Sequence, residues 1–241
     1  MRYGIFGDIH SNLEAFDRII AEYKKEHIDK YICVGDIVGY GASPHECLRR
    51  FMDLNAISVC GNHDWASIGL FPVEYFNNIA KEAVEWTQEI LNKEERGFLK
   101  SLKLIIKGQG FVVAHGSLCR PELFDYISDI KSAVKSFQIM EEDICFIGHS
   151  HIPAVFFMHE GKVKRATEDS IKVEPGLKYI INVGSVGQPR DGNPQAGFCI
   201  YDSNKKTVEI KRVDYDIEVA KNKILKAGLP EKLGYRLLTG L

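Results

Sequence analysis

The sequence predicts an α/β (α+β) fold in which two packed β-sheets carry helices on their outer faces. Residues 2–60 alternate between strand-like and helix-like patterns, which favours a sheet with crossover helices. After residue 101 the apolar period changes to two, as in antiparallel strands with one solvated face. With 241 residues and 45% apolar content, the chain can bury a sizeable core, and no linker or repeat divides it. We therefore expect a single domain over residues 1–241.

The first sixty residues predict a β-α-β-α-β unit. Short apolar runs predict strands over residues 2–7, 31–34 and 56–60. Apolar residues at helical spacing predict one helix from Leu13 to about residue 26 and another after Ser43. Ser11 with Glu14, and Ser43 with Glu46, have the capping-box pattern that begins a helix.

The rest of the chain predicts further helices and a run of mostly antiparallel strands. Helices are expected over residues 77–91, 129–139 and 215–227, and a short one after the capping box of Asn92 and Glu95. Strands are expected over residues 102–106, 111–114, 144–147, 154–158, 162–166, 179–183, 198–201 and 207–213. The tail beyond Gly228 carries no interpretable pattern.

Composition and charge exclude several classes of protein. The net charge is −2 with both signs interspersed, so we expect neither a nucleic-acid footprint nor binding to an anionic membrane. The six cysteines contain no C-x-x-C pair and several fall in apolar runs, which favours a reducing compartment. The first twenty residues include several charged side chains, and no apolar stretch reaches eighteen residues. We therefore expect a cytoplasmic protein without a signal peptide or membrane span.

Five apolar strands end in a cluster of side chains that can bind a metal ion. In chain order, these clusters are Asp8-x-His10, Gly35-Asp36, Gly61-Asn62-His63-Asp64, His115 and Gly148-His149-x-His151. In α/β sheets, ligands bind at the carboxyl ends of the strands. Imidazole and carboxylate ligands together suit Zn, Fe, Mn or Co, whereas calcium prefers oxygen ligands alone. Because no cluster contains cysteine, an open catalytic site is favoured over a closed structural zinc site.

These five motifs, in this order over residues 8–151, resemble those of the calcineurin-like metallophosphoesterases, which are D-x-H, G-D, G-N-H-(D/E), a lone H and G-H-x-H. The resemblance implies a four-layer α/β/β/α sandwich of two mixed sheets packed face to face. It implies hydrolysis of phosphoric esters at a dinuclear centre of two divalent or transition metal ions, drawn from Mn, Fe, Zn, Ni or Co. One ion would be held by Asp8, His10 and His151 and the other by Asn62, His115 and His149, with Asp36 bridging them.

The resemblance also implies catalytic roles. A hydroxide shared by the two metal ions would attack phosphorus, and the ions would neutralise charge on the phosphoryl oxygens. His63 would stabilise the transition state and protonate the leaving oxygen. Asp64 would orient His63, as carboxylates behind a functional imidazole do. The catalytic candidates are therefore His63, Asp36 and Asp64.

A glycine- and proline-rich segment, residues 182–194, resembles a loop of small bacterial and archaeal members of the family. Its backbone amides and Arg190 would bind phosphate oxygens, or the segment would be a plain turn with Arg190 in solvent. Asn12 would reach the substrate or simply begin the helix, and Asn62 is a third substrate-binding candidate. Trp65, Tyr75 and Phe76 would either wall the pocket or pack in the core.

Two departures from the family bear on the substrate. Gly39 and Tyr40 stand where the protein Ser/Thr phosphatases have an Asp-Arg pair, and where symmetric dinucleoside tetraphosphatases keep an arginine. The third motif ends in Asp64 instead of glutamate. Both favour small phosphodiesters or nucleotides as substrates, bound in a fairly open cleft. The alternatives are a dinucleoside polyphosphate (Ap4A-type) hydrolase, a phosphomonoesterase, and, from another class, a catalytically silent protein-binding scaffold. The oligomeric state is left open.

Overall fold

The computed structural model describes residues 1–241 and contains two mixed β-sheets of six strands each. The first sheet has the order β3-β2-β1-β11-β12-β9, and the second has the order β4-β5-β6-β10-β7-β8. The strands of the first sheet are β1 (Arg2–Phe6), β2 (Lys30–Cys33), β3 (Ile57–Ser58), β9 (Ser170–Lys172), β11 (Ala196–Asp202) and β12 (Thr207–Val213). Those of the second are β4 (Ile105–Lys107), β5 (Phe111–Ala114), β6 (Ile144–Ile147), β7 (Ala154–His159), β8 (Lys162–Arg165) and β10 (Lys178–Asn182).

Each sheet combines a parallel part with an antiparallel part. In the first, β1, β2 and β3 are parallel, while β11 runs antiparallel to both β1 and β12. In the second, β5, β6 and β10 are parallel, and β4 and β7 are antiparallel to their neighbours. The strands that precede the five motifs are therefore the parallel ones, whose carboxyl ends lie at one edge of each sheet.

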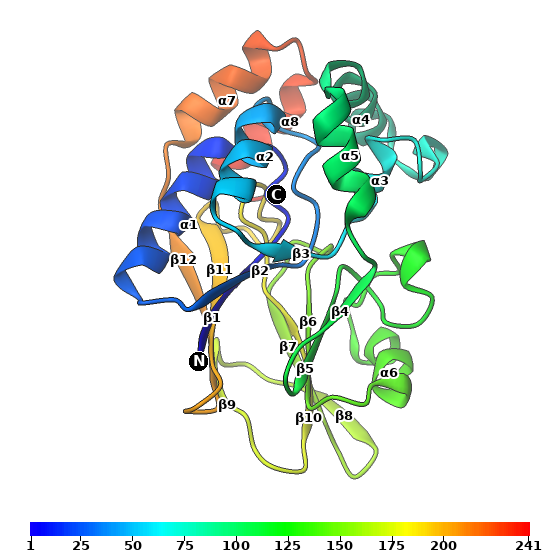
Figure 1. Cartoon of the computed structure of the whole chain (residues 1–241), viewed down its shortest axis with the longest axis vertical. Helices are drawn as coiled ribbons and strands as arrows, with labels where there is room; N and C mark the ends of the chain where they lie inside the picture. The colour runs from blue at the N-terminus through cyan, green and yellow to red at the C-terminus, as the bar shows by residue number, and fades with distance from the viewer.

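The two sheets pack face to face with helices outside, which confirms the predicted α/β/β/α sandwich (Figure 1). The apolar layer between the sheets includes Tyr3 and Tyr201 from the first and Phe111 and Phe146 from the second. Tyr3 meets Phe111 edge-on at a centroid distance of 5.2 Å. Side chains of this size contribute about 1.5–3 kcal/mol each when fully buried, so this layer holds the two sheets together.

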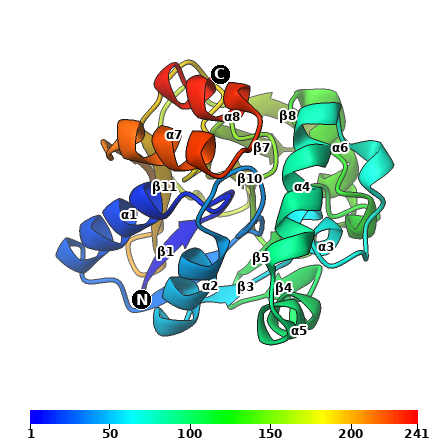
Figure 2. The same ribbon diagram turned by 90° about the horizontal axis from the view of Figure 1, so that it is seen from above.

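The two outer layers differ in size. Helices α1 (Leu13–Lys25), α2 (Pro44–Asp53) and α7 (Ile217–Lys226) lie on the first sheet, whereas only α6 (Ile130–Ile139) packs on the second. Viewed from above, α4 (Asn78–Ile90) and α5 (Lys93–Ser101) lie on the side of the molecule where β3 and β4 are found (Figure 2). The shorter helices are α3 (Asn62–Ala66), α8 (Glu231–Tyr235) and the 3₁₀ turns Val73–Tyr75, Pro121–Leu123 and Arg236–Leu238.

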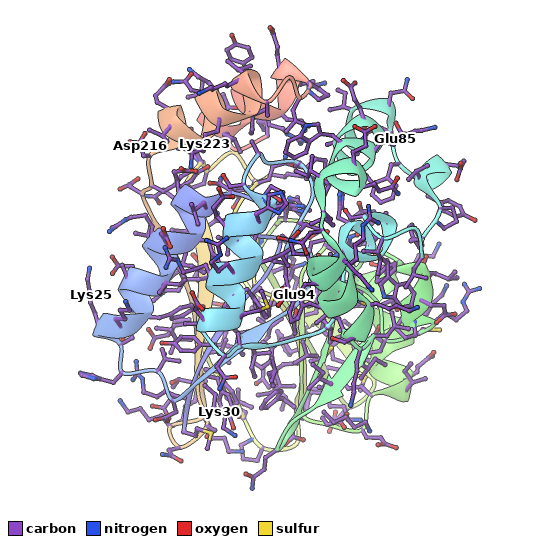
Figure 3. The ribbon with its side chains drawn as sticks, turned by 45° about the horizontal axis from the view of Figure 1, so that its top comes forward. Lys25, Lys30, Glu85, Glu94, Asp216 and Lys223 are labelled. Atoms are coloured by element: carbon purple, nitrogen blue, oxygen red, sulfur yellow. The ribbon has the colours of Figure 1, made fainter.

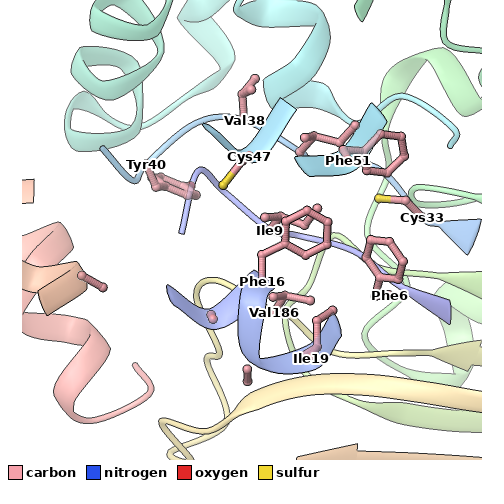
Figure 4. Close-up of a cluster of buried hydrophobic side chains, with 14 of the residues drawn as sticks. Phe6, Ile9, Phe16, Ile19, Cys33, Val38, Tyr40, Cys47, Phe51 and Val186 are labelled. Carbon is pink, nitrogen blue, oxygen red and sulfur yellow. The ribbon is translucent and has the colours of Figure 1, made fainter. Parts of the chain in front are cut away.

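Helix α1 shows why the sequence folds as predicted on the first sheet. Its apolar residues recur on one face, so that Phe16 packs against Phe6 of β1, which in turn contacts Phe51 of α2 (Figure 4).

The predicted capping boxes at the start of α1 and at the start of α2 are wrong. Asn12, not Ser11, caps α1 by accepting the Ala15 amide, and the Ser43 side chain makes no capping bond.

Most predicted elements are present, with boundaries shifted by a few residues, and the Asn92–Glu95 capping box is confirmed. The strand predicted over residues 56–60 is only two residues long. Besides the three 3₁₀ turns, three elements were not predicted: α3 within the third motif, strand β9, and α8 in the C-terminal tail. No helix combines the length and the apolar character needed to cross a membrane.

Charged side chains of both signs cover the surface. Lys25, Lys30, Glu85 and Glu94 are exposed and come from α1, β2, α4 and α5, and the exposed Asp216 precedes α7 (Figure 3). Several of these surface charges pair locally, as Lys25 does with Glu22 at 2.8 Å. Exposed pairs of this kind contribute little to stability.

Candidate metal centre

The structure brings all seven predicted ligand residues together at one edge of the sandwich. Three come from the first sheet: Asp8 follows β1, Asp36 follows β2 and Asn62 follows β3. The other three positions lie on the second sheet, where His115 follows β5 and the His149 and His151 pair follows β6. His10 lies in the loop after Asp8, and all seven side chains are buried.

The first group of ligands consists of Asp8, His10, Asp36 and His151, whose donor atoms all lie within 4.8 Å of one another. His10 Nε2 is 3.0 Å from His151 Nε2 and 3.5 Å from Asp36 Oδ2. His151 Nε2 is 3.3 Å from Asp8 Oδ1. Two imidazoles and two carboxylates that converge in this way suit a transition-metal ion.

The second group consists of Asp36, His115 and His149. His115 Nε2 is 3.3 Å from Asp36 Oδ2, 3.1 Å from His149 Nδ1 and 3.2 Å from Asn62 Oδ1. Asp36 is therefore common to both groups, and Asn62 adds a neutral oxygen ligand to the second.

Backbone carbonyls orient three of the four imidazoles. The Nδ1 atoms of His10, His115 and His151 lie 3.2, 2.8 and 2.6 Å from the carbonyl oxygens of Val38, Val34 and Gln188. A proton on Nδ1 that is donated to a carbonyl leaves Nε2 with its lone pair free. Each of these Nε2 atoms lies at the centre of the cluster, where it can bind a metal ion when it carries no proton.

The chemistry of the donor set fits metal ions. Asp36 Oδ2 is buried at the junction of the two groups, and its neighbours His115 Nε2 and His10 Nε2, at 3.3 and 3.5 Å, make no well-formed hydrogen bond to it. A buried carboxylate oxygen without a partner is costly, and a bound cation removes that cost. These residues could therefore hold divalent metal ions.

The pKa values of the ligands in the metal-free protein reflect their crowding. Burial raises the pKa of Asp8 to about 7. Burial alone would lower the pKa of His115, but the Asp36 and Asp8 carboxylates raise it to about 9. Burial keeps the pKa of His10 and His151 well below the usual range, so both rings are neutral and able to bind a metal ion at pH 7.

The backbone at the centre adopts an uncommon conformation. Asp8, His10, Asp36, His149 and His151 all have positive φ angles, between 49° and 69°. This left-handed region costs most residues about 1–2 kcal/mol, and Asp and His tolerate it better than larger side chains. The backbone therefore turns at the ligand positions themselves, and these turns direct neighbouring side chains toward one point.

Two glycines of the motifs allow the loops to approach the carboxylates. A Cβ at Gly61 would lie 2.0 Å from Asp36 Oδ1, and one at Gly148 would lie 2.3 Å from Asp8 Oδ2. No side chain fits at either position without displacing a ligand. The glycines of the third and fifth motifs are thus required for packing around the metal centre.

His63 lies beside the ligands without belonging to either group. Its ring is buried 4.8 Å from the ring of His10 and 4.3 Å from that of Tyr40. Its Nδ1 atom has no hydrogen-bond partner. Burial lowers the pKa of His63 to about 4 in the metal-free protein.

Asp64 does not orient His63 as the sequence predicted. Its carboxylate accepts hydrogen bonds from the backbone amides of Asp36, Ile37, Val38 and Gly61, at 2.8 to 3.2 Å. No hydrogen bond joins Asp64 to the imidazole. Its acceptor sites are filled by amides, so this side chain fixes the second motif against the third.

Asn12 begins the helix that follows the first motif. Its Oδ1 accepts the Ala15 amide and its Nδ2 donates to the Gly187 carbonyl at 2.9 Å. The side chain therefore uses both ends in structural contacts, and it ties the first motif to the glycine-rich segment 182–194.

Arg190 lies at the metal centre instead of extending into solvent. Its Nη2 atom donates to Tyr40 Oη at 3.1 Å and to Gln188 Oε1 at 2.9 Å, while its buried Nε has no partner. Tyr40 also contacts the rings of His10 and His63. From the sequence, Tyr40 was interpreted only as a position where related phosphatases have an arginine. In the structure, Arg190 from a different loop lies next to Tyr40.

An apolar cavity of about 430 Å³ opens beside the metal centre. His63, His149 and Arg190 line it together with several aromatic side chains, including Tyr75 and Phe76. Trp65 is not among the lining residues and packs edge-on against Phe124 at 5.6 Å. Sequence reasoning missed Tyr126, whose ring stacks on His149 at 3.8 Å. Only its position in a loop after the fourth motif could have pointed to it.

Comparisons with known proteins agree with this geometry. Residues 1–206 match the family model of the calcineurin-like phosphoesterase superfamily domain. The chain is 42% identical over 247 residues to the Uncharacterized protein MJ0912 of Methanocaldococcus jannaschii, which covers 98% of this chain and 97% of that protein. The crystal structure of a metallophosphoesterase from Sphaerobacter thermophilus is 35% identical, with a TM-score of 0.87 and full coverage of both chains. That of the hypothetical protein PH1004 from Pyrococcus horikoshii OT3 is 20% identical and shares the fold, with a TM-score of 0.82 over 100% of this chain and 98% of the other.

Proposed function

Since the chain belongs to the calcineurin-like phosphoesterase superfamily, we propose that it is a dinuclear metal-dependent phosphoesterase acting on small phosphodiesters or nucleotides. The observation that carries the proposal is the pair of ligand groups that share Asp36. A carboxylate between two cations offsets their repulsion and fixes their spacing. When bound, the two ions would lower the pKa of water and neutralise charge on the phosphoryl group.

The residues around the ligands have the chemistry that the reaction needs. His63 is on the cavity side of His10, where a neutral ring that takes up a proton could pass it to the leaving oxygen. Arg190 lines the same cavity with a guanidinium that Tyr40 and Gln188 hold in place, and this guanidinium could donate hydrogen bonds to a phosphoryl oxygen. We assign His63 to proton transfer and Arg190 to substrate binding.

The residues around the ligands favour a small phosphodiester over a phosphomonoester such as a phosphoprotein side chain. The cavity next to His63 and Arg190 has room for an organic group on the phosphate, and eight of its fourteen lining residues are hydrophobic. A monoester presents an additional negative charge, and Arg190 is the only arginine or lysine that lines this cavity. We therefore expect diesters to be turned over faster than monoesters.

The test compares two substrates on one metal-loaded preparation. The protein is first chelated and dialysed, then supplied with Mn²⁺ or Ni²⁺, and hydrolysis of bis(p-nitrophenyl) phosphate and p-nitrophenyl phosphate is followed. We expect metal-dependent turnover, with the diester hydrolysed faster than the monoester. The Asp36→Asn variant should lose turnover, whereas His159→Ala, at an exposed histidine, serves as a matched control.

Three results would support a different function. Faster monoester turnover would favour a phosphomonoesterase, and preference for dinucleoside polyphosphates in a nucleotide panel would favour an Ap4A-type hydrolase. Failure of every ester with every metal would contradict the proposal and favour a protein-binding scaffold.

A further inference from the structure

The cavity beside the metal centre is walled by aromatic rings. Six of its lining residues are aromatic: Tyr40, Phe71, Tyr75, Phe76, Phe124 and Tyr126. They come from three separate places, which are the loop after the second motif, the segment between α3 and α4, and the loop after the fourth motif. Apart from Tyr40, whose hydroxyl holds Arg190, nothing in the proposed hydrolysis needs these rings.

One wall is a continuous series of edge-to-face contacts that begins at His63. The ring of His63 is 4.8 Å from Phe76 at an interplanar angle of 76°. Phe76 is 6.0 Å from Phe71 at 89°, and Phe71 is 5.3 Å from Phe124 at 80°. Edge-to-face contacts hold each ring against the next. The wall therefore has a fixed shape before any ligand enters.

Tyr126 lines another part of the cavity. Its ring stacks on the metal-ligand candidate His149 with an interplanar angle of 12°, yet the residue is 53% exposed. Since His149 covers one face of the ring, the exposed surface belongs to the other face and the edge. Tyr75, which is 78% exposed, lies near the mouth of the same cavity. Exposed aromatic surface grouped in one hollow is typical of a ligand site.

The polar residues of the cavity are few and stand at defined places. Arg190, Asn62 and His63 lie toward the metal centre, while Asn77 and Asp125 are the polar residues among the outer aromatic rings. A phosphate would be bound at the inner end. A flat ring attached to it would lie among the outer aromatic residues, which include Phe71, Tyr75 and Tyr126. Asn77 and Asp125 could meet hydrogen-bonding groups on its edge.

We propose that this cavity binds a planar aromatic ring joined to the phosphoester, the chemistry that nucleobases and aryl esters share. The inference rests on the proposed function, because it places the ring beside the oxygen that His63 would protonate. Aromatic walls suit any flat π-system, since each ring offers a face or an edge for stacking. A saturated group of the same size gains burial but no stacking.

The experiment measures binding without turnover. Phosphonates, in which a P–C bond replaces the ester oxygen, are titrated calorimetrically into the Mn²⁺-loaded protein. The phosphonate analogues of adenosine 5′-monophosphate and ribose 5-phosphate differ only in the base, and phenylmethyl- and cyclohexylmethylphosphonate differ only in aromaticity. We expect the aromatic member of at least one pair to bind about tenfold more tightly, and the pair that responds identifies the source of the ring.

Two variants locate the effect in the cavity. Phe71→Leu and Tyr75→Ala remove rings that contact no metal-ligand candidate, so the metal centre should remain intact. Each should reduce the aromatic preference by about threefold or more, because the aromatic ligand loses stacking and burial whereas its saturated partner loses only burial. Tyr235→Ala, at a half-exposed tyrosine outside the cavity, should leave both affinities as they are.

The outcomes separate this inference from the proposed function. Equal affinities within both pairs, on a preparation that hydrolyses bis(p-nitrophenyl) phosphate, would overturn the aromatic site and leave the hydrolase in place. An aromatic preference that both variants retain would also overturn it. A preference that the variants reduce, on a preparation without hydrolysis, would support the ring site and contradict the phosphoesterase.

Discussion

His63 stands at the boundary between the metal centre and the cavity, and this position defines what it can do. It contacts His10 on one side and Phe76 on the other, and its Nδ1 is unpaired. A ring that only packed in the core would have both nitrogens paired or be replaceable by an apolar side chain. The orphaned nitrogen is a reason to assign chemistry to this residue.

We predict that the cost of His63→Ala depends on the leaving group. Protonation matters for an alkoxide and hardly at all for p-nitrophenolate, which leaves as a stable anion. The variant should lose about 10²- to 10⁴-fold in kcat for an alkyl ester but less than about tenfold for bis(p-nitrophenyl) phosphate. Steady-state kinetics with both esters checks this, with metal content measured alongside. Equal losses for the two esters would contradict the role.

Arg190 is predicted to act in substrate binding through the geometry of its guanidinium. Arg190→Lys keeps the charge but loses the planar fork that Tyr40 and Gln188 position. A hydrogen bond to a charged group is worth about 1.5–3 kcal/mol, so kcat/KM should fall by about 10- to 150-fold. Tyr40→Phe, which removes only the positioning hydroxyl, should cost less. An unchanged kcat/KM in Arg190→Lys would place the arginine outside the substrate's reach.

At the scale of single residues, the sequence predicted which side chains meet but not all that they contact. The position of Asp8, Asp36, His115 and His149 behind apolar strands, together with the family resemblance of the motifs, predicted their convergence. The hydrogen bonds of Asp64 and the ring stacking of Tyr126 could not be foreseen, because both depend on how separate loops are folded against each other. The same holds for the contact between Tyr40 and Arg190, which are 150 residues apart.

Among the elements, α1 links the first motif to the glycine-rich segment through its N-cap. Asn12 closes the first turn of the helix and also binds the carbonyl of Gly187. At Gly187 a Cβ would lie 1.8 Å from the Ile9 carbonyl oxygen, so the two segments touch through their backbones. The start of α1 and the loop that carries Arg190 thus form one unit.

We predict that Asn12→Ala lowers stability more than it affects substrate binding. Loss of an N-cap costs about 0.5–2 kcal/mol, and the buried Gly187 carbonyl loses a partner as well. Denaturant unfolding should show this loss, while KM changes by less than about twofold if the side chain does not touch the substrate. A large rise in KM at full metal occupancy would instead give Asn12 a place in the binding site.

The elements that were predicted differ physically from those that were missed. Strands β1, β6 and β11 are buried along nearly their whole length and read as apolar runs, and α1 carries a clear apolar stripe. In contrast, β9 is three residues long with exposed ends, and α3 consists of site residues whose polar character masks a helix. Helix α8 has five residues, and its position depends on contacts with α7. Tertiary contacts decide such short elements.

For the whole molecule, the metal centre is built from both sheets. Asp8, Asp36 and Asn62 are supplied by the first sheet and His115, His149 and His151 by the second. Metal ions bound there would join the two halves of the sandwich at one edge, where side-chain packing is interrupted by carboxylates. The ions should therefore contribute to folding as well as to chemistry.

We predict that chelation lowers thermal stability. Metal at a hundred times its dissociation constant stabilises the native state by about 2.7 kcal/mol, which corresponds to roughly 5–10 °C in Tm for a chain of this size. Scanning calorimetry with and without Mn²⁺ measures the difference. The Asp36→Asn variant is the control, because it removes the shared ligand, and its Tm should respond little to metal. A wild-type Tm that changes with neither chelator nor metal would contradict a contribution of the metal ions to stability.

The affinity for metal should also rise with pH. Asp8, whose pKa is about 7, and His115, whose pKa is about 9, still hold protons at neutral pH in the metal-free protein, and both must release them to bind a cation. Each displaced proton gives about a tenfold gain in apparent affinity per pH unit until the pH passes that group's pKa. The gain should therefore be steepest below pH 7 and should level off near pH 9. Competition with a chelator of known proton stoichiometry measures it, and a flat profile from pH 6 to 9 would contradict it.

The end of the sandwich away from the metal centre has a practical use. The turn between β7 and β8, at Gly161, and the loop before β10, at Gly176, lie there (Figure 1). No heavy atom lies within 4 Å of where a Cβ would stand at either glycine. An affinity tag inserted at Gly161 would attach the protein to a bead or sensor chip by the end away from the metal centre, and would leave the metal centre exposed to solvent.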